Sequence, residues 1–140
     1  MASIGTRLLT VEIDGTPYAS EVTNVRITSA ESDSDTVTFA DAAAGGARDY
    51  KLAMTLIQDA ATGSLWREVW DNAGDTVPFT IVPYGNTTAS ATQPHFEGSA
   101  VITEPDGDLL GGEANASTSA KFTVEVEWSC TAKPTIVTGA

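Results

Sequence analysis

Histidine, cysteine and basic residues are all scarce in this chain of 140 residues. His95 is the only histidine and Cys130 the only cysteine, which excludes an intrachain disulfide, Cys-based metal clusters and most catalytic triads. Seven Lys and Arg residues stand against 19 Asp and Glu residues, which gives a formal net charge of −12. A protein this acidic is not expected to grip nucleic acid by neutralising phosphates, nor to bind an anionic membrane.

Long apolar runs are missing as well. No stretch approaches 18 consecutive apolar residues, so no membrane-spanning helix is expected. Hydrophobic residues still make up 41% of the chain, which is enough for a core. The length predicts one domain over residues 1–132, followed by a C-terminal arm over 133–140 in which Pro134 precedes the apolar Ile136 and Val137.

Short runs rich in Thr, Val and Ile, separated by Gly, Asn, Asp and Pro, predict a mainly β fold of the sandwich or barrel type. The clearest strand covers residues 121–128, because apolar and polar residues alternate strictly along it. Its apolar face is predicted to lie in the core and consists of Phe122, Val124, Val126 and Trp128. Its polar face carries Lys121, Thr123, Glu125 and Glu127.

Further strands are expected at residues 8–13, 22–28, 36–40, 49–58, 76–83 and 96–103. Proline cannot donate a hydrogen bond to a sheet ladder. Pro78 and Pro83 therefore predict that the strand carrying them lies at a sheet edge, or that they stand at its ends.

One helix is predicted over residues 62–73, where the apolar Leu65, Trp66, Val69 and Trp70 share one face. Residues 59–62 offer capping side chains, and Gly74 suits the position just after the helix. We expect both tryptophans of this helix to pack against the sheet as core residues.

Two acidic clusters could in principle hold a cation, and they consist of Glu31, Asp33 and Asp35, and of Glu104, Asp106 and Asp108. Neither follows the calcium-loop pattern, and both have the composition of ordinary turns. His95, Ser64 and Cys130 stand in no nucleophile motif, and no phosphate-binding glycine loop is present. We therefore expect no enzyme, no metal and no cofactor, and paired carboxylates of a small hydrolase are the weaker interpretation.

Several blocks, in this order and spacing, resemble the major tail (tail tube) proteins of long-tailed bacteriophages, especially those of actinobacteria. They are TFADAAAGGARDYKL at 38–52, QDAATGSLW at 58–66 with Trp70, PYGN at 83–86, QPHFEG at 93–98, EPDGDLLGGE at 104–113, and the closing strand through Phe122 and Trp128. The likeness covers roughly residues 21–134.

The resemblance implies a β-sandwich or half-barrel with one flanking helix, assembled into hexameric rings that stack into a tube for DNA. It implies a virion protein that assembles in the bacterial cytoplasm and contacts other tail proteins (tape measure, tail terminator and baseplate or distal tail). Contacts between copies are expected from a loop and the C-terminal arm, through Asp41, Ala42, Ala43, Ala44, Gly45, Gly46, Ala47, Ile136 and Val137. The long polar connection 104–119 is a further candidate for assembly or binding.

The wall of such a channel should carry small polar and acidic side chains, since cations would hold phosphates in place. Thr123, Glu125 and Glu127 meet that description, and the face of strand 49–58 with Lys51, Ala53 and Thr55 is the other candidate. A monomeric β-sandwich adhesin or carbohydrate-binding module remains the alternative, with tryptophans as stacking platforms.

Overall fold

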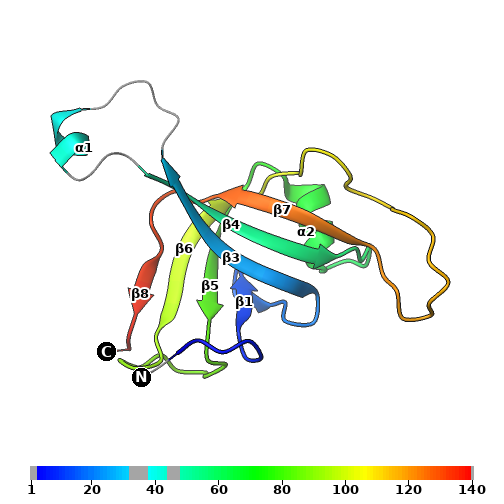
Figure 1. The fold of residues 1–140 in the computed structure, drawn as a ribbon, viewed down its shortest axis with the longest axis horizontal. Coiled ribbons are helices and arrows are strands. Elements are labelled where there is room, and N and C mark those ends of the chain that lie inside the picture. The colour runs from blue at the N-terminus through cyan, green and yellow to red at the C-terminus, as the bar shows by residue number, and fades with distance from the viewer. Residues whose placement is uncertain (1–2, 32–37, 44–47, 140) are drawn as a thin grey trace.

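The computed structural model describes residues 3–31, 38–43 and 48–139 (Figure 1). The strands are β1 (Thr10–Ile13), β2 (Thr16–Pro17), β3 (Val22–Glu31), β4 (Arg48–Ile57), β5 (Thr76–Val82), β6 (His95–Val101), β7 (Thr123–Ser129) and β8 (Thr135–Val137). The helices are α1 (Phe39–Ala43) and α2 (Leu65–Asn72). Within this described part, neither helix has the length and apolar character that crossing a bilayer requires.

Two antiparallel sheets face each other across one core. The first has the strand order β2-β1-β5-β6-β8 and the second the order β3-β4-β7. They meet where β7 ends, because Cys130 forms a bridge with Ala100 of β6 and the amide of Thr131 donates to the carbonyl oxygen of Ser99 at 3.0 Å. The predicted mainly β fold with one flanking helix is confirmed, and the short α1 is an addition to it.

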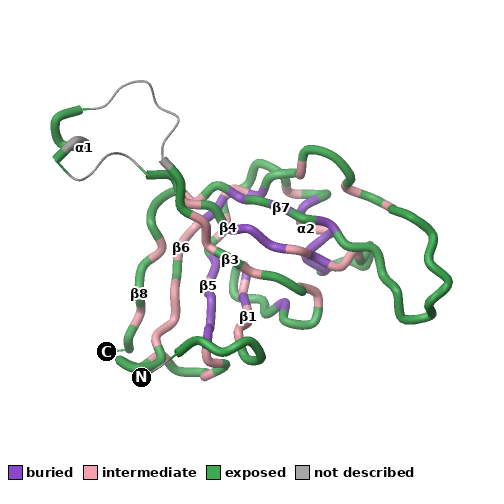
Figure 2. Tube along the Cα trace, viewed as in Figure 1, coloured by how far each residue is buried: buried purple, intermediate pink, exposed green. Residues whose placement is uncertain are grey.

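The core lies between the sheets, and buried residues line the inner faces of β4, β5 and β7 (Figure 2). Cross-strand pairs on one face stabilise a sheet, and here Leu52 pairs with Trp128 and Met54 with Val126. Four of the six predicted core residues are buried: Trp66, Val124, Val126 and Trp128.

The other two predicted core residues, Trp70 and Phe122, were wrongly assigned, since they are 49% and 45% exposed. Helix α2 buries Leu65, Trp66 and Val69, and Trp70 stacks on the outer side of Trp66 with ring centroids 5.3 Å apart. Phe122 precedes the first residue of β7, so the alternation of the sequence extends beyond the paired strand.

The expected strand at residues 36–40 was also wrong where the structure describes it. Phe39 and Ala40 begin helix α1, while residues 36 and 37 lie outside the described part of the chain. Helix α1 stands in the connection between β3 and β4, away from the body of the two sheets (Figure 1). The chain has therefore left the sheet before Phe39.

The edge position expected for the strand with Pro78 was wrong, because β5 lies in the middle of the five-stranded sheet. The carbonyl oxygen of Pro78 accepts from the amide of Asp14 at 2.8 Å, just after β1 has ended at Ile13. N–H and C=O of one strand residue point the same way, so the missing N–H of Pro78 faces this turn and interrupts no ladder. Pro83 follows the end of β5, as one of the two alternatives predicted.

Part of the expected C-terminal arm lies in a sheet. Residues Thr135–Val137 form β8 and pair with β6 at the edge of the five-stranded sheet, with Ile136 opposite Phe96. Ile136 remains 59% exposed and Val137 is half-buried. The expectation that both contact neighbouring copies stays a prediction.

The helix α2 begins and ends through local chemistry. Its N-cap is Ser64, whose hydroxyl accepts from the amide of Arg67 at 3.2 Å, so the predicted capping by residues 59–62 shifts to Ser64. The carboxylate of Glu21 accepts from the amide of Leu65 at 3.1 Å. Gly74 has a φ of +100°, which confirms its predicted place just after the helix.

Gly98 of β6 lies directly beneath the ring of Phe79, and a Cβ there would come within 2.8 Å of Phe79 Cζ. Phe79 is 2% exposed and belongs to the core cluster, so moving its ring disturbs the packing of other core residues. We expect Gly98→Ala to lower the free energy of unfolding by about 1–3 kcal/mol through overpacking. Urea unfolding followed by circular dichroism measures this, and Ser99→Ala on the same strand serves as the control. Equal stability of the two variants would contradict the prediction.

Candidate assembly surface

The two faces that the sequence offered as channel walls are one face of one sheet. Cross-strand partners share a face, and Thr55 pairs with Glu125 and Ala53 with Glu127. This face of β3-β4-β7 points away from the core, and we call it the outer face. Arg26 of β3 also belongs to it, because Arg26 pairs with Ala53. Thr123, Glu125 and Glu127 are all exposed there.

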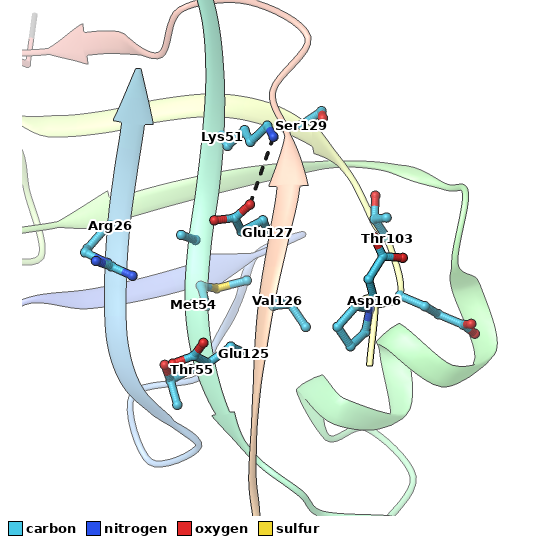
Figure 3. Close-up of a pocket in the computed structure, with 13 residues that line it drawn as sticks. Arg26, Lys51, Met54, Thr55, Thr103, Asp106, Glu125, Val126, Glu127 and Ser129 are labelled. Atoms are coloured by element: carbon cyan, nitrogen blue, oxygen red, sulfur yellow. Dashed lines mark ion pairs between the residues drawn. The ribbon is translucent and has the colours of Figure 1, made fainter. Parts of the chain in front are cut away.

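A hollow of about 420 Å³ lies on this face and extends around β7 to residues 103–106. Arg26 approaches it from β3, while Thr103 and Asp106 border it on the far side of β7 (Figure 3). Its lining is mostly polar and includes the carboxylates of Glu125 and Glu127. Such an open, polar hollow is suited to solvent or to another protein chain more than to an apolar ligand.

The charges of the outer face are only partly paired. Nζ of Lys51 lies 4.0 Å from a carboxylate oxygen of Glu127, and both side chains are about half exposed (Figure 3). An exposed pair at this distance contributes little to stability. Over the described residues, neither Arg26 nor Glu125 takes part in an ion pair.

The outer edge of β7 has unused backbone groups. The amide of Gln58 donates to the carbonyl oxygen of Phe122, and the amide of Cys130 donates to that of Tyr50. Backbone groups alternate in direction along an antiparallel strand, so those of Glu125 and Glu127 point away from β4. In the described structure no strand pairs with β7 on that side between Thr123 and Glu127, whereas just beyond β7 Cys130 forms the bridge with Ala100 of β6.

The outer edge of β3 is open in the same way. The odd-numbered residues of β4, which include Ala53, direct their backbone groups toward β3, and Arg26 pairs with Ala53. The backbone groups of Arg26 therefore point toward β4, and those of its neighbours Val25 and Ile27 point away from it. Strand β3 ends the order β3-β4-β7 and has ten residues, with no proline among them. A long edge strand without proline is a template for pairing with another chain.

The two open edges run in the same direction. Strand β3 is antiparallel to β4, and β4 is antiparallel to β7, so β3 and β7 are parallel to each other. The β3 edge of one copy can therefore lie beside the β7 edge of the next as a parallel pair. Repeating that contact produces a ring when the rotation closes.

The side chains that could take part in catalysis or metal binding have the following surroundings in the structure. Ser64 is the N-cap of α2, and a ring nitrogen of His95 hydrogen-bonds the carbonyl oxygen of Asn86 at 3.1 Å. Burial raises the pKa of the Cys130 thiol, which keeps it in the unreactive protonated form. Within the described ranges, no group of three His, Cys, Asp or Glu side chains could hold a metal ion. Of the two acidic clusters, Asp33 and Asp35 lie outside those ranges.

The predicted contact loop is described only in part. Asp41, Ala42 and Ala43 lie in α1, whereas Ala44, Gly45, Gly46 and Ala47 lie outside the described residues. Sequence reasoning missed two residues of the candidate assembly surface. Phe39 is 97% exposed at the start of α1, and Arg26 lies on the outer face. An aromatic residue beside an Ala- and Gly-rich loop was the available signal for Phe39.

The tryptophans bear on the alternative function. Trp66 and Trp128 are buried, whereas Trp70 is half exposed. Trp70 is thus the tryptophan that a ligand could reach.

In comparisons with known proteins, no protein-family model and no curated protein matches the chain.

Proposed function

We propose that this protein is a phage tail tube protein, whose copies join edge to edge into rings that stack into a conduit for DNA. The observation that carries the proposal is the pair of open, parallel edges, β3 and β7, on a sheet with a polar outer face. The resemblance of residues 21–134 to major tail proteins gives the same interpretation and adds the hexameric ring.

Edge pairing suits a ring better than a two-fold dimer. Two copies related by a two-fold axis would bring like edges together, β3 on β3 or β7 on β7, and each dimer would still expose two edges. Pairing β3 with β7 uses a different surface on each copy, and a rotation that closes leaves neither the β3 edge nor the β7 edge exposed. Neighbouring three-stranded sheets then form a continuous barrel whose inner wall is the outer face.

The charge of that wall is compatible with sliding DNA. Arg26 and Lys51 are its cations, and Glu125 and Glu127 offset them. Residues 104 and 106 add two more carboxylates at the rim of the hollow. With a net charge of −12 per copy, the wall presents no basic track that would bind phosphates.

Proline at the β7 edge tests the proposal. The backbone N–H of Glu127 points away from β4, so Glu127→Pro removes no bond within the sheet but blocks a strand that pairs with this edge. We expect wild-type protein to form rings or tubes in negative-stain images and Glu127→Pro to stay monomeric in native mass spectra. Glu127→Thr, which keeps the N–H, is the matched control and should assemble.

Mixing the Glu127→Pro variant with wild-type protein tests whether β3 of one copy pairs with β7 of the next. Glu127→Pro keeps an open β3 edge, so it should join the β7 edge of wild-type protein and end growth there. An equal amount of the variant should therefore reduce wild-type rings more than dilution does. Wild-type protein that remains monomeric at all concentrations would overturn the proposal and favour the monomeric adhesin or carbohydrate-binding module, with Trp70 as its stacking residue.

A further inference from the structure

Arg26 lies at the β3 edge with no acidic neighbour on its own sheet. Directly opposite on β4 is Ala53, and the diagonal neighbours on the same face are Lys51 and Thr55. Direct and diagonal neighbours are the cross-strand positions whose side chains interact most closely. Among these neighbours the only charged one is Lys51, so the sheet offers the Arg26 guanidinium no favourable charge interaction. The other side of Arg26 faces the open edge of β3.

Glu125 is in the complementary position at the β7 edge. Its opposite neighbour is Thr55, and the diagonal neighbours on β4 are Ala53 and Ile57, none of them a cation. Across the hollow lie residues 103–106, which include two more carboxylates. The side of Glu125 that could meet a positive charge is therefore the open edge of β7.

We propose that Arg26 of one copy pairs with Glu125 of the next copy when β3 lies beside β7. This inference rests on the proposed ring assembly and names the charged contact that selects and aligns its partner. Both side chains project from the outer face, so a parallel β3–β7 contact brings them to the same side of the joined sheet. The pair spans the two edges where the protomer leaves opposite charges uncompensated.

The relative height of the two residues fits the contact. Arg26 lies level with Ala53 and Glu127, and Glu125 lies two residues before Glu127 on β7. Strands in a barrel are staggered because they tilt, and a long arginine side chain reaches a diagonal neighbour. Glu127 already has Lys51 as its partner at 4.0 Å, which leaves Glu125 as the free acceptor.

The occupant that fits is a second copy rather than a free anion. An anion that bound Arg26 would also meet the carboxylates of Glu125 and Glu127 on the same hollow. A second copy supplies both charges at once and satisfies the open backbone groups of the edge. The contact also disfavours wrong pairing, because β7 against β7 would bring Glu125 against Glu125.

Charge reversal tests the pair. We expect Arg26→Glu alone and Glu125→Arg alone each to raise the protein concentration of half-assembly by at least about tenfold, measured by sedimentation velocity at low salt. The two changes alter the net charge in opposite directions, so an effect of net charge alone would move assembly in opposite directions. Circular dichroism confirms that each variant is folded.

Rescue identifies the contact as one between copies. An equimolar mixture of Arg26→Glu and Glu125→Arg should assemble close to the wild-type concentration, because alternating copies restore opposite charges at every contact. The double variant in one chain should do the same. If wild-type protein forms rings but single reversals assemble equally well, or if the mixture stays apart, the ion pair is refuted and the ring proposal stands. If wild-type protein forms no rings, both fail.

Discussion

Trp66→Ala is expected to lower the free energy of unfolding by about 3–5 kcal/mol, the range for a large buried aromatic residue. Trp66 is 5% exposed, and its indole N–H donates to the carbonyl oxygen of Leu109 at 2.9 Å. The substitution removes the ring that joins α2 to the core, leaves that carbonyl oxygen without its donor and takes away the surface on which Trp70 stacks. A loss of this size is a large part of the roughly 5–15 kcal/mol by which an ordinary domain is stable.

Trp70→Ala is the matched control, since the residue type and the helix are the same. Trp70 is 49% exposed, so we expect a loss of about 1 kcal/mol, mainly from the stacking contact. Both should be measured by urea unfolding in the Glu127→Pro background, because assembly would itself stabilise the folded state. Equal losses at the two positions would show that α2 does not cover the core through Trp66.

Deletion of residues 41–47 is expected to leave a folded subunit that forms rings but no long tubes. The segment belongs to the β3–β4 connection, of which the described helix α1 lies away from the body of the two sheets (Figure 1). Strands β3 and β4 pair up to Glu31 and Arg48, and residues 32–40 still close that hairpin after the deletion. Lengths of tubes in negative-stain images measure the effect, with circular dichroism as the check on folding.

Phe39→Ser is a second variant that keeps the loop length. Phe39 is 97% exposed, and an aromatic side chain that projects so far gains stability only by burial against another chain. We expect rings of normal size and much shorter tubes, with unchanged stability of the subunit. Tubes of wild-type length from the deletion would contradict the assignment of this segment to contacts between rings.

The sequence predicted elements best where a periodic pattern coincided with burial. Strand 121–128 and helix 62–73 were found because alternation and helical spacing are local signals. Phe122 and Trp70 were wrong for the same reason, because each continues a pattern beyond the point where a partner covers it. The N-cap Ser64 lies within the predicted helix, two residues after its predicted start at residue 62.

Long-range pairing decided the rest. Pro78 was predicted to lie at a sheet edge, yet it lies in a central strand. This is possible because β1 ends at Ile13, so the N–H that Pro78 lacks would face the turn after β1 and not a paired residue. Phe39 read as strand, yet it begins α1 after the chain has left the sheet. Both outcomes depend on where other strands stop, and nothing within a few residues of either position specifies that.

The sequence by itself determined a mainly β chain with one amphipathic helix, an acidic character and too few histidines and cysteines for common catalytic sites. Those properties follow from composition and from periods of two and 3.6 residues, which act locally. Only the tertiary structure brought Lys51 and Glu127 onto one face and left Arg26 and Glu125 at opposite open edges. The physical reason is that strand order arises from pairing between segments far apart in the chain, and it is strand order that determines which edges stay open.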